Sequence, residues 1–88
     1  MNDKRYVVLA SGRGSNLKSL LDAGLPGRCA MVICNRPGAA ALNVAQAHGI
    51  ATVVIDHAQY SSREAFDAAL AEEIERHRPD LVLLAGFM

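Results

Sequence analysis

Four short, largely apolar runs, separated from one another by stretches with helical character, constrain the fold of this chain most strongly. The runs span residues 6–10, 29–34, 52–55 and 81–84. Their length and their valine and isoleucine content are typical of strands that are covered on both faces of a parallel sheet. Because consecutive parallel strands require a crossover connection, we expect a helix between each pair.

The segments between the runs carry the expected helical signals. Leu17, Leu20 and Leu21 share one face of a helix that starts near Ser15. The alanine-rich segment 39–48 has high helix propensity. The alternation therefore predicts an α/β protein, a Rossmann-like three-layer α/β/α fold with a parallel sheet of strand order 3-2-1-4.

A third helix is expected to begin at about Ser62 and to end before Pro79. Ser61 and Glu64 fit a capping box, in which the serine accepts a hydrogen bond from the third N–H and the glutamate reaches back to the cap. The helical period predicts a buried stripe of Phe66, Leu70, Ile74 and His77, with Glu72, Glu73, Glu75 and Arg76 facing water.

Charge and cysteine content exclude several classes of function. Nine basic and nine acidic side chains cancel in the 88 residues, which predicts neither a nucleic-acid nor a membrane partner. Cys29 and Cys34 occupy opposite ends of one predicted strand, about 16 Å apart, so we expect neither a disulfide nor a metal site. These features favour a cytoplasmic protein, and composition carries no information on its oligomeric state.

The last predicted strand, residues 81–84, would be a central one, yet no further sequence follows to cover it and its exit loop. We therefore expect residues 1–88 to be the amino-terminal part of a larger domain, with the sheet incomplete at the C-terminus.

The glycine turn after the first strand is the strongest candidate for a binding site. Gly12 and Gly14 lead into a helix whose first turn contains Ser15 and Asn16. A helix start leaves about four backbone N–H groups without partners and carries about half a positive charge, so this turn predicts an anion cradle. The predicted strand order places it beside residues 85–88. The alternative is structural: a tight turn in which Ser15 is an ordinary cap.

The residues around the turn favour a small phosphate. A dinucleotide fingerprint needs a third glycine, where this chain has Leu17, and an acid after the second strand, where it has Asn35. The G-x-x-x-x-G-K-[ST] motif of nucleoside triphosphate sites is absent. A phosphate monoester on a sugar fits Gly14, Ser15 and Asn16 better.

Arg63 and the histidines are further candidates. Arg63 falls in the first turn of the third helix, where a cation is disfavoured, so either a ligand carboxylate or a neighbouring acid would explain it. His48 and His77 lie in the last turns of helices and are interpreted as structural. His57 lies in a loop on the ligand side of the sheet, without a Ser-His-Asp or Cys-His set beside it.

These motifs together resemble the phosphoribosylglycinamide formyltransferases, the folate-dependent enzymes of purine synthesis. The resemblance covers the whole chain, and its most specific pieces are S-G-x-G-S-N-L after the first strand and L-A-G-F-M after the last. The residues that carry it are 7–17, 33–36, 49–52, 62–67 and 79–88.

The resemblance implies transfer of a formyl group from 10-formyltetrahydrofolate to the amine of glycinamide ribonucleotide, without a metal. Residues 1–88 would be the amino-terminal, substrate-phosphate-binding part of a single formyltransferase domain. The implied binding positions are Gly14, Ser15, Asn16 and Gly86 for the substrate, and Arg63, Leu84, Phe87 and Met88 for the folate.

The resemblance implies no catalytic residue within this chain. The family's catalytic asparagine, histidine and aspartate lie beyond the L-A-G-F-M motif, so the 88 residues alone are expected to be inactive. Formyl transfer to an amine needs oxyanion stabilisation and proton removal, and the implied binding residues supply neither. Two alternatives remain open: a related hydrolase that deformylates the same folate, and a non-catalytic nucleotide-binding module.

Overall fold

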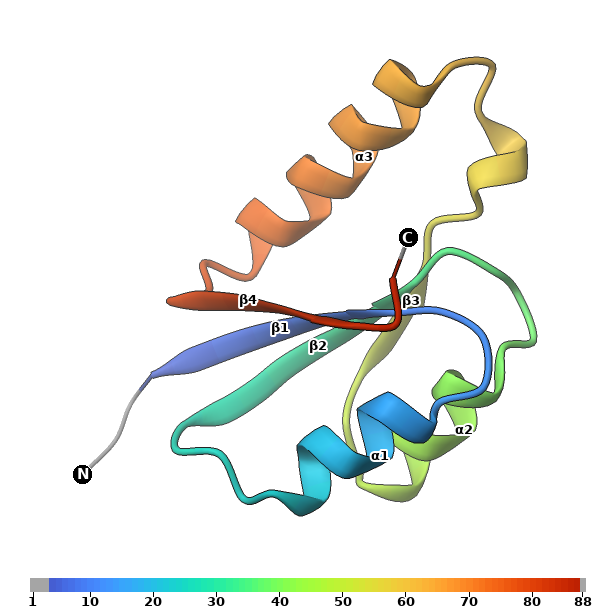
Figure 1. Ribbon diagram of the computed structural model, residues 1–88. Coiled ribbons are helices and arrows are strands. Elements are labelled where there is room, and N and C mark those ends of the chain that lie inside the picture. The colour runs from blue at the N-terminus through green and yellow to red at the C-terminus, as the bar shows by residue number, and fades with distance from the viewer. Residues whose placement is uncertain (1–3, 88) are drawn as a thin grey trace.

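The computed structural model describes residues 4–87, in which strands and helices alternate as predicted (Figure 1). The elements are β1 (Arg5–Ala10), α1 (Ser15–Asp22), β2 (Arg28–Cys34), α2 (Ala40–Ala47), β3 (Thr52–Val54), the 3-10 turn η1 (His57–Gln59), α3 (Arg63–Arg76) and β4 (Leu81–Ala85). No helix among these residues is long and apolar enough to cross a membrane.

The four strands form one parallel sheet in the order β3-β2-β1-β4, which confirms the predicted order. Helices α1 and α2 cover one face and α3 lies over the other, so the three-layer prediction is also confirmed (Figure 1). At the carboxyl end of β1, Ala10 pairs with Cys34 of β2 and with Ala85 of β4. The chain segments that leave β1 and β4 therefore start side by side.

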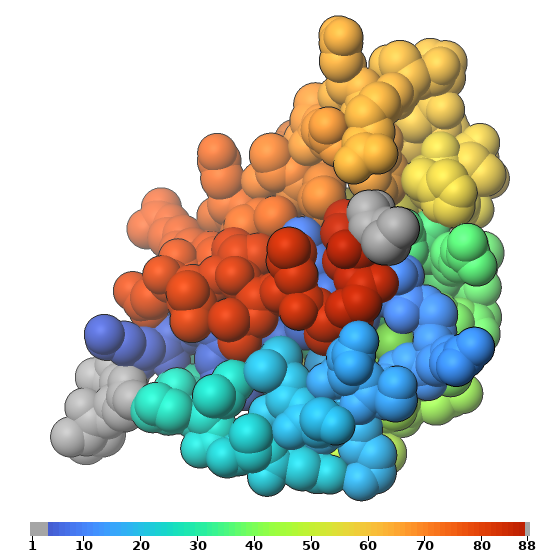
Figure 2. Space-filling model, in the orientation of Figure 1, coloured from blue at the N-terminus to red at the C-terminus, as the bar shows by residue number. Residues whose placement is uncertain are grey.

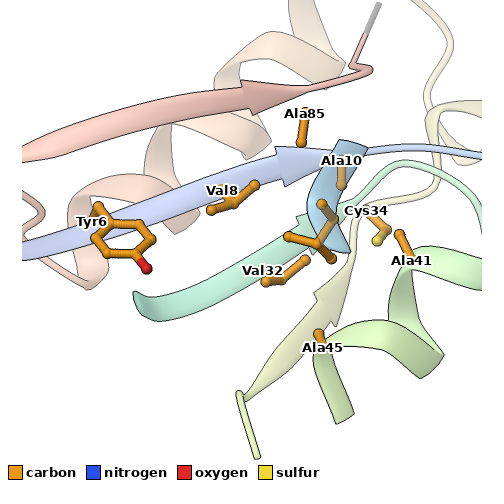
Figure 3. Packing of buried hydrophobic residues seen from close by; sticks show 9 residues of the cluster. Tyr6, Val8, Ala10, Val32, Cys34, Ala41, Ala45 and Ala85 are labelled. Atoms are coloured by element: carbon orange, nitrogen blue, oxygen red, sulfur yellow. The ribbon is translucent and has the colours of Figure 1, made fainter. Parts of the chain in front are cut away.

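Strand β1 contributes to a hydrophobic cluster on each face of the sheet. Tyr6, Val8 and Ala10 pack in the cluster under α1 and α2, which Figure 3 shows from close by. Val7 and Leu9 pack in the cluster under α3. This division follows from the two-residue period of a strand and explains why β1 is apolar throughout.

Strand β4 is much more exposed than β1. Leu81 is 55% and Leu84 is 68% exposed, and they point to opposite faces of the sheet. The strand lies along the surface in the view of Figure 2, and within residues 4–87 it has a partner strand on one edge only. Both faces of β4 thus lack a covering layer at these positions.

Helix α3 differs from the sequence prediction at its start. Its N-cap is Ser62, whose hydroxyl accepts a hydrogen bond from the N–H of Ala65 at 3.1 Å. The predicted cap at Ser61 is therefore wrong by one residue, and Glu64 falls in the first turn without the capping-box geometry. Two adjacent serines offer the same cap chemistry, and the extended backbone of Ser62 (φ −146°, ψ 159°) selects the second.

The solvent-facing side of α3 was also predicted incorrectly at one position. The side chain of Glu73 is only 15% exposed, because its carboxylate lies 2.9 Å from Nε2 of His77 one turn later. Arg76 lies 3.5 Å from the other carboxylate oxygen. Phe66 is buried as predicted, and Leu70 and Ile74 pack beside it.

Candidate functional site

The turn between β1 and α1 leaves backbone donors available at the helix start. Gly12 and Gly14 adopt left-handed φ values of 72° and 83°. Gly14 is the N-cap of α1, so no side chain caps the helix, and the first turn contains no acidic residue. The first intrahelical hydrogen bond is donated by Lys18 to the Gly14 carbonyl. The N–H groups that precede it in α1 have no intrahelical acceptor, as an anion cradle requires.

Gly14 also allows the turn to lie directly against α2. A Cβ atom at this position would be 2.9 Å from Cα and 3.0 Å from the backbone N of Ala41. Ala41 is itself fully buried beside Ala10 and Cys34 in the cluster of Figure 3. The close contact between the turn and α2 thus requires a glycine in the turn and a small residue, Ala41, in the helix.

The loop after β4 completes a shallow hollow above this turn. The Ser11 hydroxyl donates a hydrogen bond to the Gly86 carbonyl at 2.6 Å. Gly86 has a φ of 77°, and a Cβ atom there would lie 3.2 Å from Nδ2 of Asn16. The hollow has a volume of about 260 Å³ and is lined by Ser11, Arg13, Gly14, Ser15, Asn16, Ala85 and Gly86.

All four residues proposed from the sequence as substrate positions line this hollow. The structure therefore brings Gly14, Ser15 and Asn16 together with Gly86, as the predicted strand order required. Sequence reasoning did not single out Ser11, whose bonding partner is 75 residues away. Two signals could have found it: a hydroxyl residue where an apolar strand meets a glycine turn, and its place as the first residue of the S-G-x-G-S-N-L motif.

A second and larger hollow lies between the loop after β2 and the start of α3. Its volume is about 420 Å³, and its lining contains Asn35, Arg36, His57, Tyr60, Ser61, Ser62, Arg63 and Phe66. Three of these residues have basic side chains and none is acidic. The second hollow therefore has the polarity of a site for an anionic group.

Arg63 has an acidic neighbour, which is one of the two explanations for a cation in the first turn of α3. Its Nε donates to Oδ1 of Asp67 at 3.3 Å, and both side chains are more than half exposed. Exposed pairs of this kind contribute at most about 1 kcal/mol. The ion pair is thus compatible with a ligand at the remaining nitrogens of the guanidinium group.

His57 is oriented by the backbone of the loop after β2. Its Nδ1 lies 3.0 Å from the carbonyl oxygen of Asn35. Because a carbonyl only accepts, Nδ1 carries the proton, which leaves Nε2 as the acceptor of the neutral ring. The side-chain oxygen of Asn35 is buried and has no hydrogen-bond partner among residues 4–87.

The structure shows the surroundings of three of the four residues predicted to bind folate. Arg63 lines the second hollow, whereas Leu84 lies on the exposed side of β4. Phe87 stacks on Phe66, with ring centroids 6.5 Å apart, and Phe66 in turn contacts Tyr60. Phe66 thus connects the loop after β4 with the second hollow. Met88 lies outside the described residues.

Among the described residues, the first hollow lacks an acid–base set for formyl transfer. The first hollow has no histidine, aspartate or glutamate in its lining. Within the described part of the chain, no three His, Cys, Asp or Glu side chains gather as a metal site would require. The geometry of the first hollow is that of a binding site.

Comparison with known proteins identifies the family. The family model described as formyl transferase matches residues 4–88. The chain belongs to the formyl transferase family. This family membership confirms the resemblance seen in the motifs on either side of the first hollow.

Individual relatives match nearly the whole chain. Phosphoribosylglycinamide formyltransferase of Escherichia coli is 43% identical over 86 residues, which cover 93% of this chain and 41% of that protein. The trifunctional purine biosynthetic protein adenosine-3 of Drosophila melanogaster is 44% identical over 91 residues, covering 97% of this chain and 7% of that protein.

A solved structure of the family has the same fold. The crystal structure of glycinamide ribonucleotide transformylase 1 from Symbiobacterium toebii superimposes with a TM-score of 0.89 at 46% sequence identity. The match covers 98% of this chain and 42% of that one. The chain thus spans less than half the length of these relatives.

Proposed function

We propose that this chain supplies the substrate-phosphate loop and the start of the folate pocket of a phosphoribosylglycinamide formyltransferase. The reaction would transfer the formyl group of 10-formyltetrahydrofolate to the amine of glycinamide ribonucleotide, in the synthesis of purines. The observation that carries the proposal is the uncapped start of α1, which opens into the first hollow opposite Gly86. Two relatives, a phosphoribosylglycinamide formyltransferase and a glycinamide ribonucleotide transformylase, support the same reaction by their names.

The phosphate monoester of the substrate would occupy the first hollow. The backbone N–H groups of Ser15 and Asn16 would bind its oxygens, assisted by the helix dipole. The Ser15 hydroxyl and the Asn16 amide can add further hydrogen bonds. Gly14 would hold the turn in the required conformation, and Gly86 would leave room for the ligand beside Asn16.

The folate co-substrate would extend from the loop after β4 toward the second hollow. Leu84, Phe87 and Met88 would provide apolar contacts for the pterin, and Arg63 would bind a carboxylate of the tail. The stack of Phe87 on Phe66 supports this path, because it joins the two regions. The residues that perform the chemistry would belong to a part of the domain that residues 1–88 do not include. We further propose that the protein acts in the cytoplasm.

Titration of the purified chain with glycinamide ribonucleotide tests the phosphate site. Substitution Asn16→Ala should weaken binding about tenfold or more, the effect of losing one hydrogen bond to a charged group. Ser19→Ala is the matched control, because Ser19 is exposed on the same helix and does not line the hollow. Equal affinities for the wild type and Asn16→Ala would contradict the assignment.

A second assay tests whether the 88 residues bind the substrate without catalysing formyl transfer. The purified chain, given both substrates, should release no formylated product, because no acid–base pair lines the first hollow. Product formation that disappears on His57→Ala would contradict this expectation and place chemistry in the second hollow.

A further inference from the structure

The hydrogen bond from Ser11 to Gly86 joins the two segments that form the first hollow. Sheet pairing between β1 and β4 ends at Ala10 and Ala85, so Ser11 and Gly86 are the next residue on each side. The distance of 2.6 Å from the Ser11 Oγ to the Gly86 carbonyl oxygen is at the short end for O–H···O bonds. This bond extends the contact between the two segments by one residue beyond the sheet.

The bond acts where the backbone after β4 changes direction. Gly86 is left-handed, with a φ of 77°, so the chain turns away from the sheet there. The amide of Asn16 lies close to Gly86 on the other side, and Phe87 stacks on Phe66 directly afterwards. The direction of the Gly86 carbonyl therefore decides how the loop lies over the start of α1.

We propose that Ser11 is a positioning residue that couples the phosphate turn to the loop after β4. This inference rests on the proposed function, in which the phosphate binds at the start of α1 and Phe87 contacts the folate. The Ser11 hydroxyl would act through the Gly86 carbonyl, to which it donates its hydrogen bond. It holds the Gly86 peptide in place, so that substrate binding at the turn is transmitted to the segment that meets the folate.

The first measurement needs no ligand. Backbone order parameters from ¹⁵N relaxation are compared for the wild type, Ser11→Ala and the matched control Ser19→Ala. In Ser11→Ala the order parameters of Gly86 and Phe87 should fall from about 0.85 toward 0.6, while those of β1 and β4 stay unchanged. Ser11→Thr keeps the hydroxyl and should restore the order. Ser11→Cys, with a weaker donor of similar size, should fall between them.

The second measurement adds glycinamide ribonucleotide and follows the amide signals. In the wild type, Phe87 should respond at the same ligand concentrations as Ser15 and Asn16. In Ser11→Ala the response of Phe87 should be lost while that of Ser15 persists, with a Kd raised about two- to tenfold, the effect of one neutral hydrogen bond. A role confined to stability would leave the Phe87 response intact, and that outcome overturns the proposal.

The two measurements separate this inference from the proposed function. If the ligand moves no signal at Ser15 or Asn16 in the wild type, the phosphate assignment fails, and with it the coupling to substrate. If the order of Gly86 and Phe87 is the same in Ser11→Ala as in the wild type, Ser11 does not position the loop, whatever the ligand does.

Discussion

Replacing Gly14 with alanine should destabilise the fold through two effects that the structure separates. The left-handed φ of 83° costs any residue with a Cβ about 1 to 2 kcal/mol. The new Cβ would also lie 2.9 Å from Cα of Ala41, and overpacking of this kind costs about 1 to 3 kcal/mol. The expected loss is thus about 2 to 5 kcal/mol, against a total stability of about 4 to 13 kcal/mol for a chain of this length.

Gly12 provides the matched control for this prediction. It lies in the same turn with a φ of 72°, but a Cβ there would have no heavy atom within 4 Å. Gly12→Ala should therefore lose only the backbone contribution of about 1 to 2 kcal/mol. Urea unfolding followed by circular dichroism measures both variants. Equal destabilisation of the two would refute the argument that Gly14 is required by its contact with α2.

Three further predictions concern the helix cap, a histidine and the exposed strand. Ser62→Ala should lower the free energy of unfolding by about 1 kcal/mol, because the N-cap bond of α3 is lost. Hydrogen bonds to the Val44 carbonyl and to Asp22 raise the pKa of His48 above 6.5. The protonated His48 side chain therefore stabilises the folded state fully below pH 6.5, and this stabilisation is lost as the pH rises through the raised pKa. His48→Gln should remove this part of the pH dependence of the free energy of unfolding, measured with urea. The second edge of β4 has no partner strand among residues 4–87, so we expect the purified chain to self-associate there. Leu84→Lys should reduce this self-association in analytical ultracentrifugation with little change in stability, because the Leu84 side chain is 68% exposed.

Each of these three has an outcome that would contradict it. If Ser61→Ala lowers the free energy of unfolding more than Ser62→Ala does, Ser61 is the N-cap of α3, as the sequence predicted. A pH dependence of unfolding near neutrality that is identical in His48→Gln and the wild type would remove His48 as its source. A loss of several kcal/mol in Leu84→Lys would show that this residue is packed within the chain itself.

The features predicted correctly from the sequence are those encoded locally. The strand order follows from four apolar runs and from the handedness of crossovers, and it fixes which loops meet. Gly14, Ser15 and Asn16 could be placed together at one hollow because they are consecutive in a glycine turn at a helix start, and their role in binding a phosphate stays a prediction. The meeting of this turn with Gly86 then follows from topology alone.

The features that were missed depend on distant or finely balanced contacts. The role of Ser11 depends on a carbonyl 75 residues away, for which the sequence has no local pattern. The cap of α3 depended on a choice between two serines that the preceding backbone makes. The burial of Glu73 arises from its partner His77, and helical periodicity alone counts a glutamate as exposed.

The pairing of β1 with β4 has a consequence for the order of events during synthesis. These strands are neighbours in the sheet, yet residues 11 and 86 are 75 positions apart in the chain. On the ribosome, β1, α1, β2 and α2 can emerge and associate while the second edge of β1 still has no partner. Closing so long a loop costs conformational entropy, and only the contacts that β4 makes with β1 offset this cost. The first hollow, which needs residues from both ends of this loop, should therefore form late among the described residues 4–87.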